Sequence, residues 1–258
     1  MFHEDMITAA GSAQNKLNLF SASTGKYLMA SVLAGLYIGL GVLVMSVSGG
    51  VLSTAGHPAA RFLNAFVFPV ALTLVVFAGA ELFTGNVFVM TAGLLEKKAG
   101  FSDVLHILLI SYLGNLLGSL FCALLFQSTG LLSGNTLAFI LTTSETKMSL
   151  PALQLISRGI FCNLLVCLAV WCCLRMKTEA GKLIVIFWCI FTFVVCGFEH
   201  SIANMTMLSL ALLAPHTAAI SAAGFLYNLF FVTAGNLIGG ALIALCYRYI
   251  GAERSGIS

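Results

Sequence analysis

Six long apolar stretches constrain the fold of this chain more than any other feature of its sequence. A helix needs about 20 mostly apolar residues to cross the hydrocarbon core of a lipid bilayer, and each stretch is at least that long. They occupy residues 28–48, 62–94, 104–127, 153–174, 183–213 and 217–247. With 60% hydrophobic and 8% charged residues, the chain is also too apolar for a soluble domain. The sequence therefore predicts an all-α membrane protein with six transmembrane helices.

The flanking segments predict the orientation of the chain. Residues 1–27 are polar and lack the apolar core and cleavage site of a signal peptide, so we expect a cytoplasmic N-terminal segment before a six-helix transmembrane domain at 28–258. Nine basic residues lie on the side that carries both termini, against Arg61, Lys147 and Arg158 on the other side. This excess predicts cytoplasmic termini in a multi-pass protein of the cytoplasmic (inner) membrane. The net charge of +3 follows from these flanks and indicates no nucleic-acid partner.

The second and fifth stretches are too long for one simple crossing, and they carry matching motifs. GAELFTGN at 79–86 and GFEHSIAN at 197–204 share the pattern Gly-x-Glu-x-x-x-x-Asn, 118 positions apart. A second pair, GNLLG at 114–118 and GNLIG at 235–239, is 121 positions apart in the third and sixth stretches. For the glycines of this second pair we favour close helix packing, because Gly-x-x-x-Gly is typical of helix pairs in membranes.

The matches predict two halves of three helices each, at 28–127 and 153–247. Weaker echoes between the first and fourth stretches are 124 positions apart: Gly35 with Gly159, and Gly39 with Asn163. An odd number of crossings puts the second half into the membrane upside down, as an inverted-topology repeat of three plus three helices. We expect the second and fifth helices to break at their motifs near the midplane, where glycine weakens the helix.

Glu81 and Glu199 are the carboxylates that lie deep inside predicted helices, and they occupy the same position of the repeat. An unpaired carboxylate in hydrocarbon costs at least about 2.5 kcal/mol, so each should face the protein interior and form hydrogen bonds. They could coordinate an ion, or accept hydrogen bonds from backbone N–H groups freed by the breaks. Because the pair is symmetric, we favour the structural role, with Asn86 and Asn204 of the same motifs also supporting the breaks.

The two motifs differ where Leu82 corresponds to His200 and where Thr84 corresponds to Ile202. We therefore expect the histidine and the threonine hydroxyl to face each other across the pseudo-axis, although a buried histidine can also be an ordinary core residue. The surrounding candidates for a lining are bulky and apolar, namely Phe68, Leu72, Phe83, Val166 and Phe193. An apolar constriction of this kind excludes hydrated ions unless something offsets their desolvation.

Four motifs together resemble those of the formate/nitrite transporter family. They are GAELFTGN, NLLVCLAVW at 163–171, GFEHSIANM at 197–205 and GNLIGG at 235–240. The resemblance covers nearly the whole chain and implies an aquaporin-like helical fold, a homopentamer with one pore in each subunit, and no enzymatic activity. It also implies transport of small monovalent anions of weak acids, such as formate, nitrite or hydrosulfide. Short loops after the third and fifth helices resemble the nitrite and hydrosulfide branches more than the formate channels.

On the matching positions, the resemblance implies two constrictions. The cytoplasmic one would contain Leu82, Phe83, Thr84, Val166 and His200, with Asn163 nearby, and the outer one Phe68, Leu72 and Phe193. Lys147 would concentrate anions beside the outer part of the path, or it is an ordinary solvated loop lysine. His200 could donate a proton to the anion or stay charged as a counter-ion, since histidine has a reference pKa of about 6.5.

Two alternatives come from other functional classes. A neutral-solute channel of the aquaporin type would share the inverted repeat, but the paired Asn-Pro-Ala motifs are absent. An intramembrane metal enzyme would have Glu81, Glu199 and His200 as possible ligands, without the spacing of a known metal signature. The eight cysteines show no Cys-x-x-Cys spacing and are interpreted as apolar filler. We therefore expect neither a metal nor another cofactor.

Overall fold

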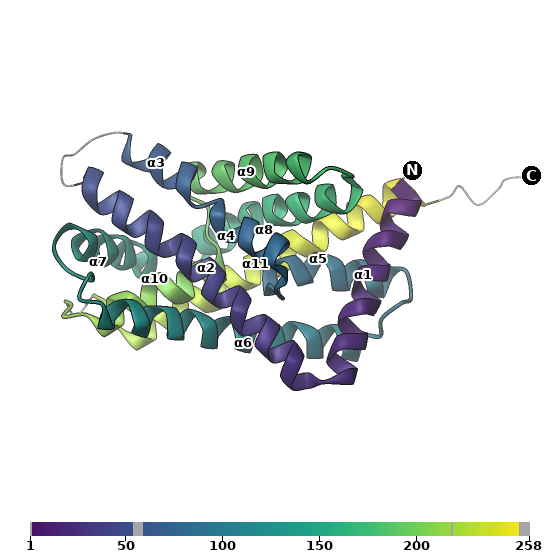
Figure 1. Ribbon diagram of the computed structural model, residues 1–258, viewed down its shortest axis with the longest axis horizontal. Helices are drawn as coiled ribbons and strands as arrows, with labels where there is room; N and C mark the ends of the chain where they lie inside the picture. Colours follow the sequence, from purple (N-terminus) through teal and green to yellow (C-terminus); the bar gives the residue numbers. More distant parts are fainter. Residues whose placement is uncertain (1, 54–58, 218, 253–258) are drawn as a thin grey trace, which may run out of the picture.

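The computed structural model describes residues 2–53, 59–217 and 219–252. Within these ranges every regular element is a helix (Figure 1). In chain order they are α1 (Phe2–Ala22), α2 (Thr24–Ser53), α3 (Ala60–Val67), α4 (Val70–Leu74), the π-helix η1 (Val75–Gly79), α5 (Phe83–Leu95), α6 (Phe101–Ser128), α7 (Gly134–Ser149), α8 (Ala152–Arg175), α9 (Glu179–Cys196), α10 (Ser201–Leu213) and α11 (Ala222–Gly251). Six segments in the described ranges are long and apolar enough to cross a membrane, which confirms the predicted fold class.

The second and fifth predicted helices are both broken at their motifs. Gly79 and Gly197 have left-handed backbone conformations, with φ of 79° and 73°, which glycine adopts without the steric penalty of a side chain. The chain is extended after each glycine and becomes helical again at Phe83 in α5 and at Ser201 in α10. The predicted breaks are therefore confirmed.

A further interruption, which was not predicted, separates α3 from α4. Pro69 has no backbone N–H, so a regular helical hydrogen-bond pattern cannot pass through it. Instead, the Ala71 N–H donates to the Phe68 carbonyl at 3.0 Å, and the Thr73 N–H donates to the Pro69 carbonyl at 3.1 Å. Phe68, which precedes Pro69, lies in the interior and is 3% exposed.

The helices α1 and α7, which are not among the six membrane-length segments, lie at opposite ends of the bundle (Figure 1). The predicted N-terminal segment forms α1, which buries Met6, Ala9 and Ala13 on one helical face and packs on α5 and α11. The connection between α6 and α8, predicted as a short loop, contains α7, which buries Ile140 and Met148. Polar residues in the second half of α7 explain why its sequence did not stand out as an apolar stretch.

The glycines of the GNLLG and GNLIG motifs bring helix backbones together. A Cβ atom on Gly118 of α6 would collide with the Val32 carbonyl of α2, and one on Gly239 of α11 would collide with the Ile160 carbonyl of α8. Such close approach through small residues is typical of helix pairs in membranes. The predicted packing role of these glycines is confirmed, and it brings α6 against α2 and α11 against α8.

Candidate functional site

Three cavities share lining residues and therefore form a row through the bundle. The α7-side vestibule, which α7 helps to line, has a volume of about 160 Å³, and the α1-side vestibule, which α1 helps to line, has about 390 Å³. Between them is a central cavity of about 10 Å³. This is roughly the space that one water molecule needs, so an ion that crosses the central cavity must lose most of its hydration shell.

Apolar side chains close the central cavity at both ends. Phe68 and Phe193 line it together with the α7-side vestibule, and their rings meet edge to face with centroids 5.7 Å apart. Leu72 and Leu82 line it together with the α1-side vestibule, and Val166 also contributes to its wall. Leu72, which was expected beside Phe68 and Phe193, thus lies with Leu82 toward the other vestibule.

His200 supplies the polar side chain of the central cavity. It is 3% exposed, and its Nδ1 atom accepts a hydrogen bond from the Ala203 backbone N–H at 3.1 Å, which caps the start of α10. Because Nδ1 is an acceptor, the proton of a neutral ring lies on Nε2, which is 3.0 Å from Thr84 Oγ1. The expected meeting of His200 and Thr84 is present. A second proton on Nδ1 would oppose the Ala203 N–H, so this geometry favours neutral imidazole.

Phe83 and Asn163 are placed beside the path and do not line the three cavities. The ring of Phe83 packs edge to face on Tyr112, with centroids 5.0 Å apart. The Asn163 amide donates to the carbonyls of Thr84 at 3.2 Å and of Asn236 at 2.6 Å. Asn163 therefore holds the Thr84 backbone beside the His200–Thr84 pair, and Phe83 packs on α6.

Side-chain donors, and not backbone N–H groups, form the hydrogen bonds of the two glutamate carboxylates. The Glu81 carboxylate accepts hydrogen bonds from Lys16 Nζ at 2.6 Å, Tyr27 Oη at 2.8 Å and Asn86 Nδ2 at 3.1 Å. The predicted role as a direct acceptor for the freed backbone is therefore wrong. A lysine partner removes the cost of an unpaired carboxylate, which explains how Glu81 is accommodated inside the bundle.

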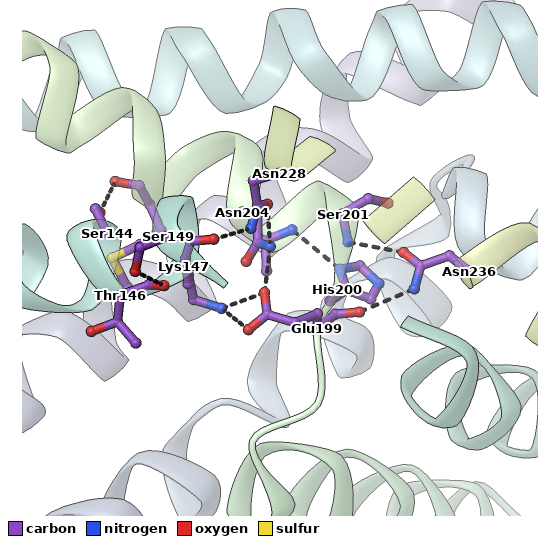
Figure 2. A network of polar contacts seen from close by, with 12 residues as sticks. Ser144, Thr146, Lys147, Ser149, Glu199, His200, Ser201, Asn204, Asn228 and Asn236 are labelled. Atoms are coloured by element: carbon purple, nitrogen blue, oxygen red, sulfur yellow. Dashed lines mark hydrogen bonds and ion pairs between the residues drawn. The ribbon is translucent and has the colours of Figure 1, made fainter. Parts of the chain in front are cut away.

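Glu199 has the corresponding environment at the other end (Figure 2). Lys147 Nζ lies 2.8 Å and 2.7 Å from its two carboxylate oxygens, and Asn204 Nδ2 donates to it at 2.6 Å. Asn228 extends this network by accepting from the Asn204 amide at 2.8 Å and donating to the Lys147 carbonyl at 2.9 Å. Lys147 therefore lies at the vestibule as expected, but its positive charge is paired with a carboxylate.

Two asparagines that were not predicted support the breaks directly. The Asn115 amide oxygen accepts from the Phe83 N–H at 2.9 Å, and the Asn236 amide oxygen accepts from the Ser201 N–H at 2.9 Å. Their amide nitrogens donate to the carbonyls of Glu81 at 2.9 Å and of Glu199 at 3.0 Å. Each asparagine thus satisfies the backbone on both sides of an extended segment. They are the Asn of GNLLG and of GNLIG, a signal that was assigned to glycine packing alone.

The two breaks make corresponding contacts with the first and fourth membrane-length helices. The Glu81 N–H donates to the Ala30 carbonyl of α2 at 3.1 Å, and the Glu199 N–H donates to the Arg158 carbonyl of α8 at 3.3 Å. Ala30 and Arg158 are 128 positions apart, whereas the glycine echoes predicted 124. The predicted alignment of these two helices is therefore wrong by four residues, about one helical turn.

The three residues considered as metal ligands are not brought together for that purpose. Glu81 pairs with Lys16 beside the α1-side vestibule, and Glu199 pairs with Lys147 beside the α7-side vestibule. His200 directs its two ring nitrogens to Ala203 and Thr84. In the part of the chain that the structure describes, no group of three His, Cys, Asp or Glu side chains is arranged to hold a metal ion.

Sequence comparison and structure comparison both find similarity to formate and nitrite transporters. A family model described as formate/nitrite transporter matches residues 3–250. The nitrite transporter NirC of Escherichia coli (strain K12) is 36% identical over 252 residues, which cover 96% of this chain and 92% of the relative. A probable formate transporter of Methanothermobacter thermautotrophicus is 38% identical over 250 residues, with 89% and 90% covered.

Solved structures extend the similarity to the whole architecture. An FNT family ion channel superposes with a TM-score of 0.90 at 33% identity, covering 96% of this chain and 98% of the other. A pentameric formate channel with formate bound superposes with a TM-score of 0.77 at 27% identity, covering 89% and 97%. Because the family model and these relatives match nearly the full length, the chain belongs to the formate/nitrite transporter family.

Proposed function

We propose that this protein conducts small monovalent anions of weak acids through the row of three cavities in each subunit. The observation that carries the proposal is the central cavity of about 10 Å³, which is apolar except for His200 among its described lining residues. A dehydrated anion is expensive in such surroundings, whereas the neutral acid formed by its protonation is not. The proposed substrate class therefore has two properties, a single charge and a readily added proton.

His200 has a specific place in this mechanism. When an anion or its acid reaches the central cavity, the Nε2–H group, whose nitrogen is 3.0 Å from Thr84 Oγ1, can turn its hydrogen bond to the acceptor atom of the substrate. Thr84 thus acts as the resting acceptor, so the buried N–H is not left unsatisfied between passages. Because Nδ1 stays bonded to the Ala203 N–H, we propose that His200 acts as a neutral hydrogen-bond donor and that the proton comes from water in the vestibules.

We also propose a homopentamer in the cytoplasmic membrane with both termini in the cytoplasm. The pentameric assembly is supported by the similarity to a pentameric formate channel, with a TM-score of 0.77. The orientation is supported by the excess of Lys and Arg on the side of the termini. In this arrangement the α1-side vestibule opens to the cytoplasm, and the protein has a transport role and no enzymatic one.

Flux measurements on purified protein in liposomes test the proposal. We expect nitrite, formate and hydrosulfide to cross faster than in protein-free liposomes, with the fluxes rising as the pH falls from about 7.5 to about 6 because more neutral acid forms. Chloride is the matched control, because it is a monovalent anion that does not protonate in this range. A chloride flux equal to that of nitrite, or no protein-dependent flux of any weak-acid anion, would contradict the proposed function.

A further inference from the structure

The two vestibules differ in their charged side chains. Lys16 and Glu81 line the α1-side vestibule and form an ion pair at 2.6 Å. Lys147 and Glu199 line the α7-side vestibule and pair at 2.7 Å, but this vestibule also contains Arg61. Each lysine charge is therefore balanced by its glutamate. Among the described residues that line the two vestibules, Arg61 is the one charged side chain that forms no ion pair.

Arg61 is held on the wall that leads to the central cavity. It lies in the first turn of α3 and is exposed. A Cβ atom on Gly197 would collide with its guanidinium, so the missing side chain at that position leaves the space that the guanidinium occupies. Gly197 precedes by three residues His200, which lines both the α7-side vestibule and the central cavity. An anion bound at Arg61 is thus positioned at the approach to His200.

No described hydrogen bond joins the Arg61 guanidinium to a carbonyl at the end of α9. Arginine near a helix C-terminus can hydrogen-bond the last carbonyl groups. The carbonyls of Phe193 and Val194 at the end of α9, however, already accept from the backbone N–H groups of Phe198 and Gly197, both at 3.0 Å. The guanidinium lines the α7-side vestibule and is exposed, so a solute in the vestibule can reach it.

The shape of this donor group favours particular anions. A guanidinium offers two parallel N–H groups, which match the two oxygens of a planar carboxylate-like anion, whereas an ammonium acts as a point charge. Formate and nitrite each present two oxygens in one plane, but hydrosulfide does not. We propose that Arg61 captures anions in the α7-side vestibule and favours planar anions with two oxygens over hydrosulfide. This inference rests on the proposed conduction of weak-acid anions.

This inference is tested by measuring nitrite and hydrosulfide uptake into sealed vesicles in which the protein has one known orientation. Protease access to a tag on α1 reports that orientation. For uptake from the Arg61 side, Arg61→Gln should raise the half-saturating nitrite concentration about threefold to tenfold at low ionic strength, with the maximal rate nearly unchanged. The difference should shrink at about 0.5 M salt because the attraction is screened. Arg61→Lys keeps the positive charge but loses the two parallel N–H groups, so it should leave hydrosulfide uptake near the wild-type level and still raise the half-saturating concentration for nitrite. From the α1 side, Arg61→Gln should have no effect.

Arg158→Gln is the matched control. Arg158 lies on the same side in α8, donates to the Gln154 side chain at 3.4 Å and does not line the vestibule. An equal rise in the half-saturating concentration for Arg158→Gln, or an unchanged value for folded, pentameric Arg61→Gln, would overturn the role of Arg61. If Arg61→Gln is unchanged and the wild-type protein takes up nitrite normally, only the role of Arg61 is contradicted and the proposed function stands. If the wild-type protein takes up no nitrite, the proposed function and the role of Arg61 are both contradicted.

Discussion

At the scale of single residues, His200 combines a structural bond and a functional one. Its Nδ1 atom caps α10 through the Ala203 N–H, and its Nε2 atom faces Thr84 from the wall of the central cavity. The first bond fixes the ring orientation and the tautomer, and the second keeps the N–H satisfied until a substrate arrives. A different side chain at this position could keep the bond to the Ala203 N–H and lose the bond to Thr84, so a substitution can separate the two roles.

His200→Asn makes this separation. Asparagine is a favourable N-cap residue, so α10 should keep its cap, but the shorter side chain should no longer present a donor to Thr84. We expect folded pentamers whose nitrite flux is about fivefold lower, the effect of losing a hydrogen bond worth about 1 kcal/mol. The shape of the pH–flux profile in liposomes should be unchanged, because a neutral histidine does not titrate during passage.

Thr84→Val is the control for the opposite partner, since it removes the hydroxyl and keeps the shape of the side chain. It should leave the Nε2–H in place and reduce the flux less than His200→Asn does. If His200→Asn removed the pH dependence while protein density and folding were matched, His200 would be a titrating group, and the neutral-donor mechanism would be wrong.

At the scale of elements, the asparagines of α6 and α11 hold the broken helices. Asn236 accepts from the Ser201 N–H and donates to the carbonyls of Glu199 and Gly159, at distances between 2.9 and 3.0 Å. It is fully buried, so water does not replace these bonds easily. The extended segment that carries His200 therefore depends on a neighbouring helix for its position.

Asn236→Leu should destabilise the protein before it changes selectivity. Leucine has a similar size but leaves three buried backbone groups without this partner, and each such group costs about 1 to 3 kcal/mol. We expect a clearly lower thermal unfolding temperature in detergent, or loss of the folded pentamer. Asn18→Leu, at an exposed position of α1, is the control and should have little effect. A stable Asn236→Leu variant with normal unfolding would show that the segment holds itself.

The sequence predicted the breaks but not what supports them. A glycine before a glutamate inside an over-long apolar stretch predicts a helix break without knowledge of distant contacts, because backbone freedom is a property of the residue itself. The roles of Asn115 and Asn236 depend on partners more than 30 positions away, and their neighbouring glycines already had a sufficient explanation. Sequence alone also could not pair Lys16 and Lys147 with the glutamates, since these contacts join helices that are distant in the chain.

At the scale of the whole molecule, two short polar arrangements are placed at opposite ends of one apolar barrier. The pairs Lys16–Glu81 and Lys147–Glu199 fasten α1 and α7 to the broken helices, and the vestibules open beside them. The His200–Thr84 pair was predicted from the differences between the two motifs, and the apolar residues of the barrier from the surroundings of His200 and from the family resemblance. Arg61 was counted only for topology, because nothing in its sequence neighbourhood indicates that it reaches the vestibule wall.

Passage through the central cavity can be tested most directly by widening it. Leu82 lines the central cavity and the α1-side vestibule and is 4% exposed, so Leu82→Ala should open the barrier at one end. Leu208→Ala is the control for lost packing, because Leu208 is buried and does not line the cavities. In liposomes with matched amounts of folded pentamer, we predict faster nitrite flux and a measurable chloride flux for Leu82→Ala only. Unchanged nitrite flux and chloride exclusion in Leu82→Ala would contradict the assignment of this cavity as the conducting path.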